Sequence, residues 1–219
     1  MPKSDGGAVL EFARAGAAVG ATSATSQKAR ILGAYFRTLD DDDLRRAAVF
    51  MSGRALGPGK RGKLGLGWAV LSKVVESVSG RDPDELQAIF RKHSDLGDWA
   101  GEALDGRTEP EPVTLAQVEE TLEAIRTARG AAKAAPLEKL LRRLHPEAAR
   151  FVVKVISGEM RIGLSEGLVE AAIAEAFGLP VTTVKRVHLI TGDIGVTAVR
   201  CKQGEIGRAS CRERVYDDV

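Results

Sequence analysis

Apolar residues recur every three or four positions along most of this chain, a spacing that places them on one face of an α-helix. No segment shows the alternation of apolar and polar residues that is typical of a half-buried β-strand. The pattern therefore predicts an all-α fold. The expected helices cover residues 8–19, 26–38, 40–51, 68–79, 82–93, 114–127, 136–144, 146–157, 165–177 and 182–189, and a short helix opens at 95.

Helix-capping residues stand at several of these boundaries. The acidic run at 40–43 places one carboxylate before its helix and three in the first turn, where they offset the positive end of the helix dipole. A metal site at this run is the rarer alternative. Asp82 and Thr114 begin helices in the same way, each followed three residues later by Glu or Gln. The capping pattern supports the helix boundaries.

The chain also contains an internal repeat. Lys63-Leu64-Gly65-Leu66 recurs 98 residues later as Arg161-Ile162-Gly163-Leu164, and Asp95-Leu96-Gly97 recurs at the same offset as Asp193-Ile194-Gly195. The residues that end and begin helices are thus repeated, which two unrelated alanine-rich helices do not explain. Upstream matches at an offset of 105 pair Lys28, Ala29, Leu32, Arg37, Leu39 and Ser52-Gly53 with Lys133, Ala134, Leu137, Arg142, Leu144 and Ser157-Gly158.

The repeat predicts a helical domain over residues 8–200, built from two pseudo-symmetric copies at roughly 8–106 and 113–200. Residues 1–7 are expected to form a disordered start. Residues 201–219 are charged and lack an apolar stripe, so we expect them to be a tail that is not native to the fold.

Composition narrows the class of protein. The 219 residues are 44% hydrophobic and only 5% aromatic, which suits packed helices, and the net charge is +2. No apolar run is long enough to span a bilayer, and Cys201 and Cys211 are too few for a disulfide framework or a zinc site. We expect a cytoplasmic protein without membrane contact.

Two glycine-containing turns are the candidate binding elements. Residues 53–67 contain four basic residues, no acidic residues and six glycines, and residues 157–165 repeat the basic-apolar-Gly-Leu turn. Exposed backbone amides beside Lys and Arg suit phosphate oxygens. A flexible surface loop is the plain alternative for 53–67. The candidate phosphate contacts are Lys60, Arg61, Lys63, Gly65, Gly67, Arg161, Gly163 and Ser165.

These motifs resemble the N-terminal DNA-binding domain of ATP-dependent DNA ligases. The resemblance rests on Lys63-Leu64-Gly65-Leu66-Gly67, Leu71-Ser72-Lys73-Val74-Val75, Asp95-Leu96-Gly97 and, above all, residues 144–177 with Ser157-Gly158-Glu159-Met160-Arg161-Ile162-Gly163-Leu164 at their centre. It covers roughly residues 8–200. It implies an all-helical, pseudo-symmetric domain that holds the minor groove on both sides of a nick in duplex DNA.

The resemblance also implies a larger parent enzyme with nucleotidyltransferase and OB-fold domains, which uses ATP and Mg²⁺ to join a 5′-phosphate to a 3′-hydroxyl in replication, repair or recombination. We expect this chain to need no cofactor, to bind nicked duplex DNA without reading its sequence, and to be inactive by itself. Lys3-Ser4-Asp5-Gly6 fits the adenylylation signature of such enzymes, but it leads into a helix rather than a strand-lined pocket, so we reject it as a catalytic site.

Two other functions compete with DNA binding. A helical-repeat scaffold that binds protein explains the duplication and the low net charge, but not the paired basic turns. A stand-alone enzyme would need a catalytic triad, a metal cluster or a nucleotide-binding loop, and the sequence offers none of these patterns.

Overall fold

The computed structural model describes residues 8–57, 64 and 66–205, and these form twelve α-helices. No strand occurs among them, apart from an isolated bridge between Ala8 and Thr114, so the predicted all-α class is confirmed for this part of the chain. The helices are α1 (Val9–Gly20), α2 (Thr25–Arg37), α3 (Asp41–Met51), α4 (Trp68–Ser79), α5 (Pro83–Lys92), α6 (Leu96–Ala103), α7 (Leu115–Thr127), α8 (Ala134–Arg143), α9 (Pro146–Ser157), α10 (Glu166–Phe177), α11 (Val181–Thr191) and α12 (Ile194–Gln203), with a 3₁₀ turn at Gly130–Lys133 before α8.

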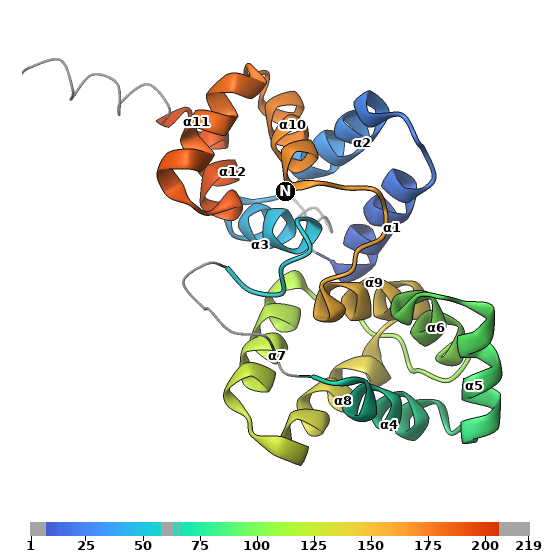
Figure 1. Cartoon of the computed structure of the whole chain (residues 1–219). Coiled ribbons are helices and arrows are strands. Elements are labelled where there is room, and N and C mark those ends of the chain that lie inside the picture. The colour runs from blue at the N-terminus through green and yellow to red at the C-terminus, as the bar shows by residue number, and fades with distance from the viewer. Residues whose placement is uncertain (1–7, 58–63, 65, 206–219) are drawn as a thin grey trace, which may run out of the picture.

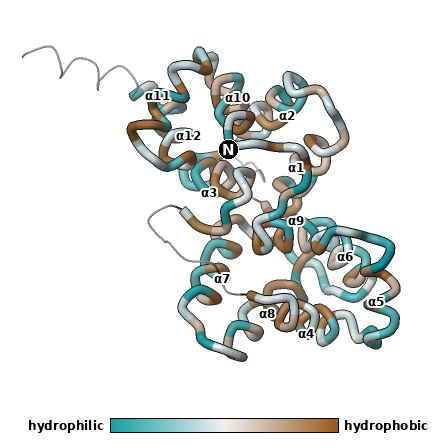
Figure 2. The backbone as a smooth tube through the Cα atoms, viewed as in Figure 1, coloured by the Kyte–Doolittle hydropathy of each residue, from teal (hydrophilic) through white to brown (hydrophobic). Residues whose placement is uncertain are grey.

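Local sequence explains most helix ends. Asp40 accepts a hydrogen bond from the backbone N–H of Asp43 at 2.8 Å, which confirms the capping interpretation of the acidic run. Thr114 and Gln117 form the reciprocal pair of bonds of a capping box at the start of α7. Helices α4, α9, α10, α11 and α12 end at glycines in the left-handed conformation. Hydrophilic and hydrophobic residues are interspersed along the helices, as expected where one face is buried (Figure 2).

The helices form two lobes (Figure 1). The upper lobe holds α1, α2 and α3 together with α10, α11 and α12, and the lower lobe holds α4 to α9. In the upper lobe α2 packs on α10 and α3 on α12; in the lower lobe α4 packs on α8 and α6 on α9. The lobes therefore do not coincide with the segments 8–106 and 113–200, because each of those segments contributes helices to both lobes.

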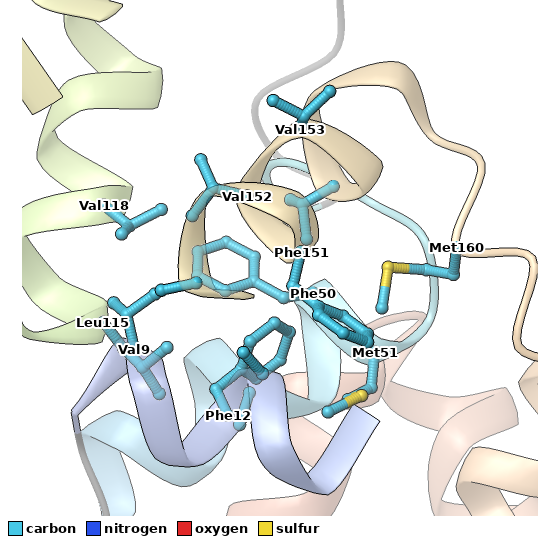
Figure 3. Close-up of a cluster of buried hydrophobic side chains, with 14 of the residues drawn as sticks. Val9, Phe12, Phe50, Met51, Leu115, Val118, Phe151, Val152, Val153 and Met160 are labelled. Atoms are coloured by element: carbon cyan, nitrogen blue, oxygen red, sulfur yellow. The ribbon is translucent and has the colours of Figure 1, made fainter. Parts of the chain in front are cut away.

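A shared aromatic core joins the lobes. Phe12 of α1 meets Phe50 of α3 with ring centroids 6.0 Å apart, and meets Phe151 of α9 at 6.4 Å, both edge to face. Figure 3 shows these three rings in one buried cluster, which also contains Leu115 of α7. Edge-to-face pairs contribute about 0.5–1.5 kcal/mol each beyond the area that they bury. The core thus fixes the lobes against each other.

The C-terminal boundary of the fold differs from the prediction. Helix α12 continues to Gln203, and Cys201 is only 3% exposed, so the expectation that the tail begins at residue 201 is wrong for its first three residues. The side chain of Lys202 donates to the backbone oxygen of Leu39 at 2.9 Å and ties this last turn to the upper lobe. Gly204, in the left-handed conformation, ends the helix. No helix was predicted over residues 194–203, because these contacts are long-range and a local residue pattern does not reveal them.

Two segments carry the chain between the lobes. The first connector, residues 54–67, leads from α3 to α4, and the second connector, residues 158–165, leads from α9 to α10. Both contain the glycine turns that the sequence singles out. The connectors therefore contain the candidate binding residues.

Candidate nucleic-acid interface

The predicted contact residues divide between the two connectors. Lys60, Arg61, Lys63 and Gly65 of the first connector lie outside the residues that the structure describes. Gly67 ends that connector, and its φ is −78°, with open space where a side chain would project. The other predicted residues, all in the second connector, are Arg161, Gly163 and Ser165.

The two connectors begin side by side. A Cβ atom placed on Gly53 would lie 3.4 Å from the backbone oxygen of Gly158, and one placed on Gly158 would lie 3.6 Å from that of Gly53. A shallow hollow of about 650 Å³ follows this contact. Three of the predicted contact residues thus share one surface with the start of the first connector. The hollow is lined by Ser52, Gly53, Gly158, Glu159, Met160, Arg161, Gly163, Leu164 and Ser165.

The backbone of the second connector is unusual. Arg161 has φ +48° and Gly163 has φ +62°, with Ile162 between them at negative φ. Such alternation is typical of backbone nests, in which successive N–H groups converge and attract anions. Within the described part of the chain, no acceptor takes a hydrogen bond from the backbone N–H groups of residues 161–165. This turn can therefore offer amide donors to an anionic ligand.

Two lysines from distant helices contact the connectors. The Lys28 amine, on α2, donates to the backbone oxygens of Ile162 at 2.5 Å and Gly163 at 3.2 Å. The Lys133 amine, just before α8, donates to the backbone oxygen of Leu64 at 2.5 Å. Both lysines are matched residues of the repeat, but no binding role was predicted for them. The available signal was a charged residue on the apolar face of its helix, since Lys28 precedes Leu32 by one turn.

The charge of Arg161 is largely compensated within the protein. Its guanidinium lies 2.6 Å from a carboxylate oxygen of Glu159, donates to the backbone oxygen of Ser94 at 2.5 Å, and comes within 3.8 Å of Asp95. The side chain is 51% exposed, as expected for a residue before a helix. Arg161 therefore does not present the free charge that was predicted from the sequence.

The helices that follow the connectors start differently. Ser165 caps α10 by accepting from the N–H of Leu168, and Glu166 adds a carboxylate in the first turn, 2.9 Å from Arg54 of the first connector. Helix α4 follows Gly67 with no side-chain cap and no acidic residue in its first turn. The start of α4 is thus the more favourable of the two for an anion.

The described residues were also compared with the requirements of a metal site and of a membrane-spanning helix. In residues 8–57, 64 and 66–205, no group of three or more His, Cys, Asp or Glu side chains is arranged to hold a metal ion. Over those same residues no single helix is long and apolar enough to cross a membrane; α10 and α11 meet the length and composition criteria only as a pair bent by 119°.

Comparison with known proteins identifies the family of this chain. The family described as "DNA ligase N terminus" matches residues 9–174. The "Probable DNA ligase" of Koribacter versatilis is 34% identical over 197 residues, which cover 89% of this chain and 34% of that protein. The "DNA ligase" of Archaeoglobus fulgidus is 31% identical over 207 residues, covering 90% of this chain and 37% of that protein. This chain thus spans about a third of these relatives, and it belongs to the family of DNA ligase N-terminal domains.

Proposed function

We propose that this chain is the DNA-binding domain of an ATP-dependent DNA ligase and grips nicked duplex DNA through the two connectors. The support comes from relatives named DNA ligases together with two adjacent connectors that suit an anionic backbone. The parent enzyme would join a 5′-phosphate to a 3′-hydroxyl with ATP and Mg²⁺, using nucleotidyltransferase and OB-fold domains, in replication, repair or recombination.

The observation that carries the proposal is the row of unpaired amides at residues 161–165. Phosphate oxygens accept hydrogen bonds from such amides, and contacts to phosphates position a protein on DNA without reading its sequence. The first connector adds Lys60, Arg61 and Lys63 as cations for neighbouring phosphates. We therefore expect binding without sequence preference.

We also propose that the two sequence copies are related by a pseudo-twofold axis and exchange their halves. Gly97 of α6 approaches the backbone oxygen of Arg150 in α9, and Gly195 of α12 approaches that of Arg45 in α3. Gly97 matches Gly195 at the offset of 98, and Arg45 matches Arg150 at the offset of 105. An arrangement of this kind would bring the two connectors together at the axis, so that they contact DNA on both sides of a nick.

A protein-binding scaffold remains the rival function, and one observation favours it. Leu189 and Ile190 on α11 are 86% and 63% exposed, and large apolar side chains exposed side by side often mark contact surfaces. The same exposed pair also fits the DNA-binding proposal, because a domain of a longer ligase would contact its neighbouring domains. The surface on α11 is therefore a candidate contact with the rest of the parent enzyme.

We expect the chain by itself to be inactive in ligation. Incubation with radiolabelled ATP and Mg²⁺ should leave the protein unlabelled, because the sequence Lys3-Ser4-Asp5-Gly6 leads into a helix and not into the strand-lined pocket that adenylylation needs. Label that is transferred to the wild type and lost in Lys3→Ala would contradict this expectation.

The proposal is tested by fluorescence anisotropy with a nicked duplex and an intact duplex of unrelated sequence. We expect both to bind, the nicked duplex at least as tightly, with dissociation constants that do not depend on sequence. A scaffold that binds only protein would leave the anisotropy of both duplexes unchanged.

A further inference from the structure

We propose that Lys28 and Lys133 are positioning residues for DNA binding. The Lys28 amine holds the backbone oxygens of Ile162 and Gly163 inward, so that the amides of the second connector face the DNA, and the Lys133 amine holds the backbone oxygen of Leu64 in the first connector. The inference rests on the proposed function and adds residues that do not touch DNA themselves.

Lys28 is placed where a lysine is costly. It is 6% exposed on the apolar face of α2, near Leu32, and no described carboxylate pairs with its amine. A buried amine must find acceptors, since burying an unsatisfied polar group is unfavourable. Its acceptors are the backbone oxygens of Ile162 and Gly163. The burial of Lys28 is therefore satisfied only when the second connector has this conformation.

The geometry of the peptide bond determines where the amides next to this contact point. All peptide bonds in the described chain are trans, and in a planar trans peptide the C=O and the following N–H point in opposite directions. Since the oxygens of Ile162 and Gly163 point to Lys28, the N–H groups of Gly163 and Leu164 point away from it. These are two of the amides that lack an acceptor.

The turn that Lys28 contacts has an unfavourable backbone. Arg161 at φ +48° is a non-glycine residue in the left-handed region, which L-residues other than glycine rarely adopt. A Cβ atom on Gly163 would lie 2.5 Å from the Lys28 amine, so the turn fits closely around this lysine. Among the described residues, Lys28 is the side chain that bonds the backbone oxygens of Ile162 and Gly163, so its loss frees the centre of the turn.

The contact occurs twice. Lys133 reaches Leu64 at 2.5 Å as Lys28 reaches Ile162, and the two lysines and their two acceptors are matched residues of the repeat. In both cases the lysine and the connector are far apart in sequence. Two such contacts at matched positions indicate a common role rather than an isolated packing accident.

The experiment compares Lys28→Met and Lys133→Met with a matched control. Methionine keeps the length of the side chain and removes the donors. The control is Lys202→Met, which also removes a lysine that donates to a backbone oxygen, that of Leu39. Lys202 pairs with Asp41 at 2.7 Å as well, and its hydrogen bonds and ion pairs within the described residues include neither connector. Binding to nicked duplex is measured by anisotropy, folding by thermal denaturation, and the amides of Gly163 and Leu164 by ¹⁵N NMR.

For the wild type we expect the Gly163 and Leu164 amide signals to shift on addition of nicked duplex. Lys28→Met should weaken binding by about tenfold, in keeping with the loss of a hydrogen bond to a charged group, and should abolish those shifts while the protein stays folded. Lys133 is half-buried, so Lys133→Met should fold even if Lys28→Met fails to fold. We expect Lys133→Met to weaken DNA binding as well. Lys202→Met should bind as the wild type does.

The outcomes separate the inference from the function on which it rests. A wild type that does not bind DNA contradicts the proposed function. A wild type that binds, together with a folded Lys28→Met or Lys133→Met of unchanged affinity, overturns the positioning role. A purely structural role would lower the melting temperature of these variants and leave the affinity of the folded protein unchanged.

Discussion

The two connectors share a left-handed glycine and a lysine contact, but their charges and helix starts differ. Each follows a helix that ends with a left-handed glycine, and each gives a backbone oxygen to a lysine from a distant helix. The second connector compensates its own charges, with Arg161 beside Glu159 and Ser165 capping the next helix. The first ends at an uncapped helix and carries unbalanced cations in its sequence. The comparison indicates that amides dominate the second connector and cations the first.

The largest difference between the connectors is expected for substitutions of glycine, because the backbone conformations at Gly163 and Gly67 differ. Gly163→Val places a β-branched residue at φ +62° and a Cβ against Lys28, so we expect a loss of roughly 3 kcal/mol in stability and of most DNA affinity. Gly67→Val stands at negative φ in open space, so its stability should change by less than about 1 kcal/mol. Urea unfolding and anisotropy measure both. Equal losses of stability in the two variants would contradict the distinction.

Acid should loosen the support of the second connector. Burial by itself would raise the pKa of Asp95, but hydrogen bonds from the amine of Lys154 and from the backbone N–H of Asp98 outweigh it and hold the pKa below its usual range. A carboxyl with a lowered pKa contributes stability above about pH 4, and this contribution is lost as the pH falls through the lowered value.

Asp95→Asn isolates this contribution. It keeps a capping side chain but removes the charge that faces Lys154 at 2.5 Å, so we expect a loss of about 2 kcal/mol near pH 7. The difference between the variant and the wild type should shrink as the pH is lowered from 5 to 2. Urea unfolding at several pH values would show it, and a difference independent of pH would exclude Asp95 as the group responsible.

The smallest effect should come from Glu159. The sequence alone predicts that Lys63 and Arg161 contribute one phosphate contact each. Because Glu159 compensates Arg161, we expect Arg161→Ala to weaken DNA binding less than Lys63→Ala does. Glu159→Gln should strengthen binding about two- to threefold by releasing the guanidinium, an effect typical of an exposed ion pair. Anisotropy at low salt measures all three, and a weakened Glu159→Gln would show that Glu159 supports the site instead.

Local features were predictable from the sequence, and long-range ones were not. The caps at Asp82 and Thr114 depend on residues three positions apart, and both were predicted from the sequence. The contact of Lys28 with Ile162 joins residues 134 positions apart, so no local pattern reveals it. The repeat likewise identified matched segments without saying which of them pack together, and the lobes combine helices from both. The compensation of Arg161 by Glu159 follows from a side-chain conformation that spacing does not determine.

The most direct test of the account is the salt dependence of binding to nicked duplex DNA. Each phosphate contact on duplex DNA contributes about −0.9 to the slope of log affinity against log salt concentration. With a handful of contacts from the two connectors, we expect a slope of about −3 to −5 for the wild type, and a shallower slope for Lys63→Ala by about one contact. An affinity that stays constant between about 50 and 200 mM salt would contradict the claim that the connectors bind phosphates.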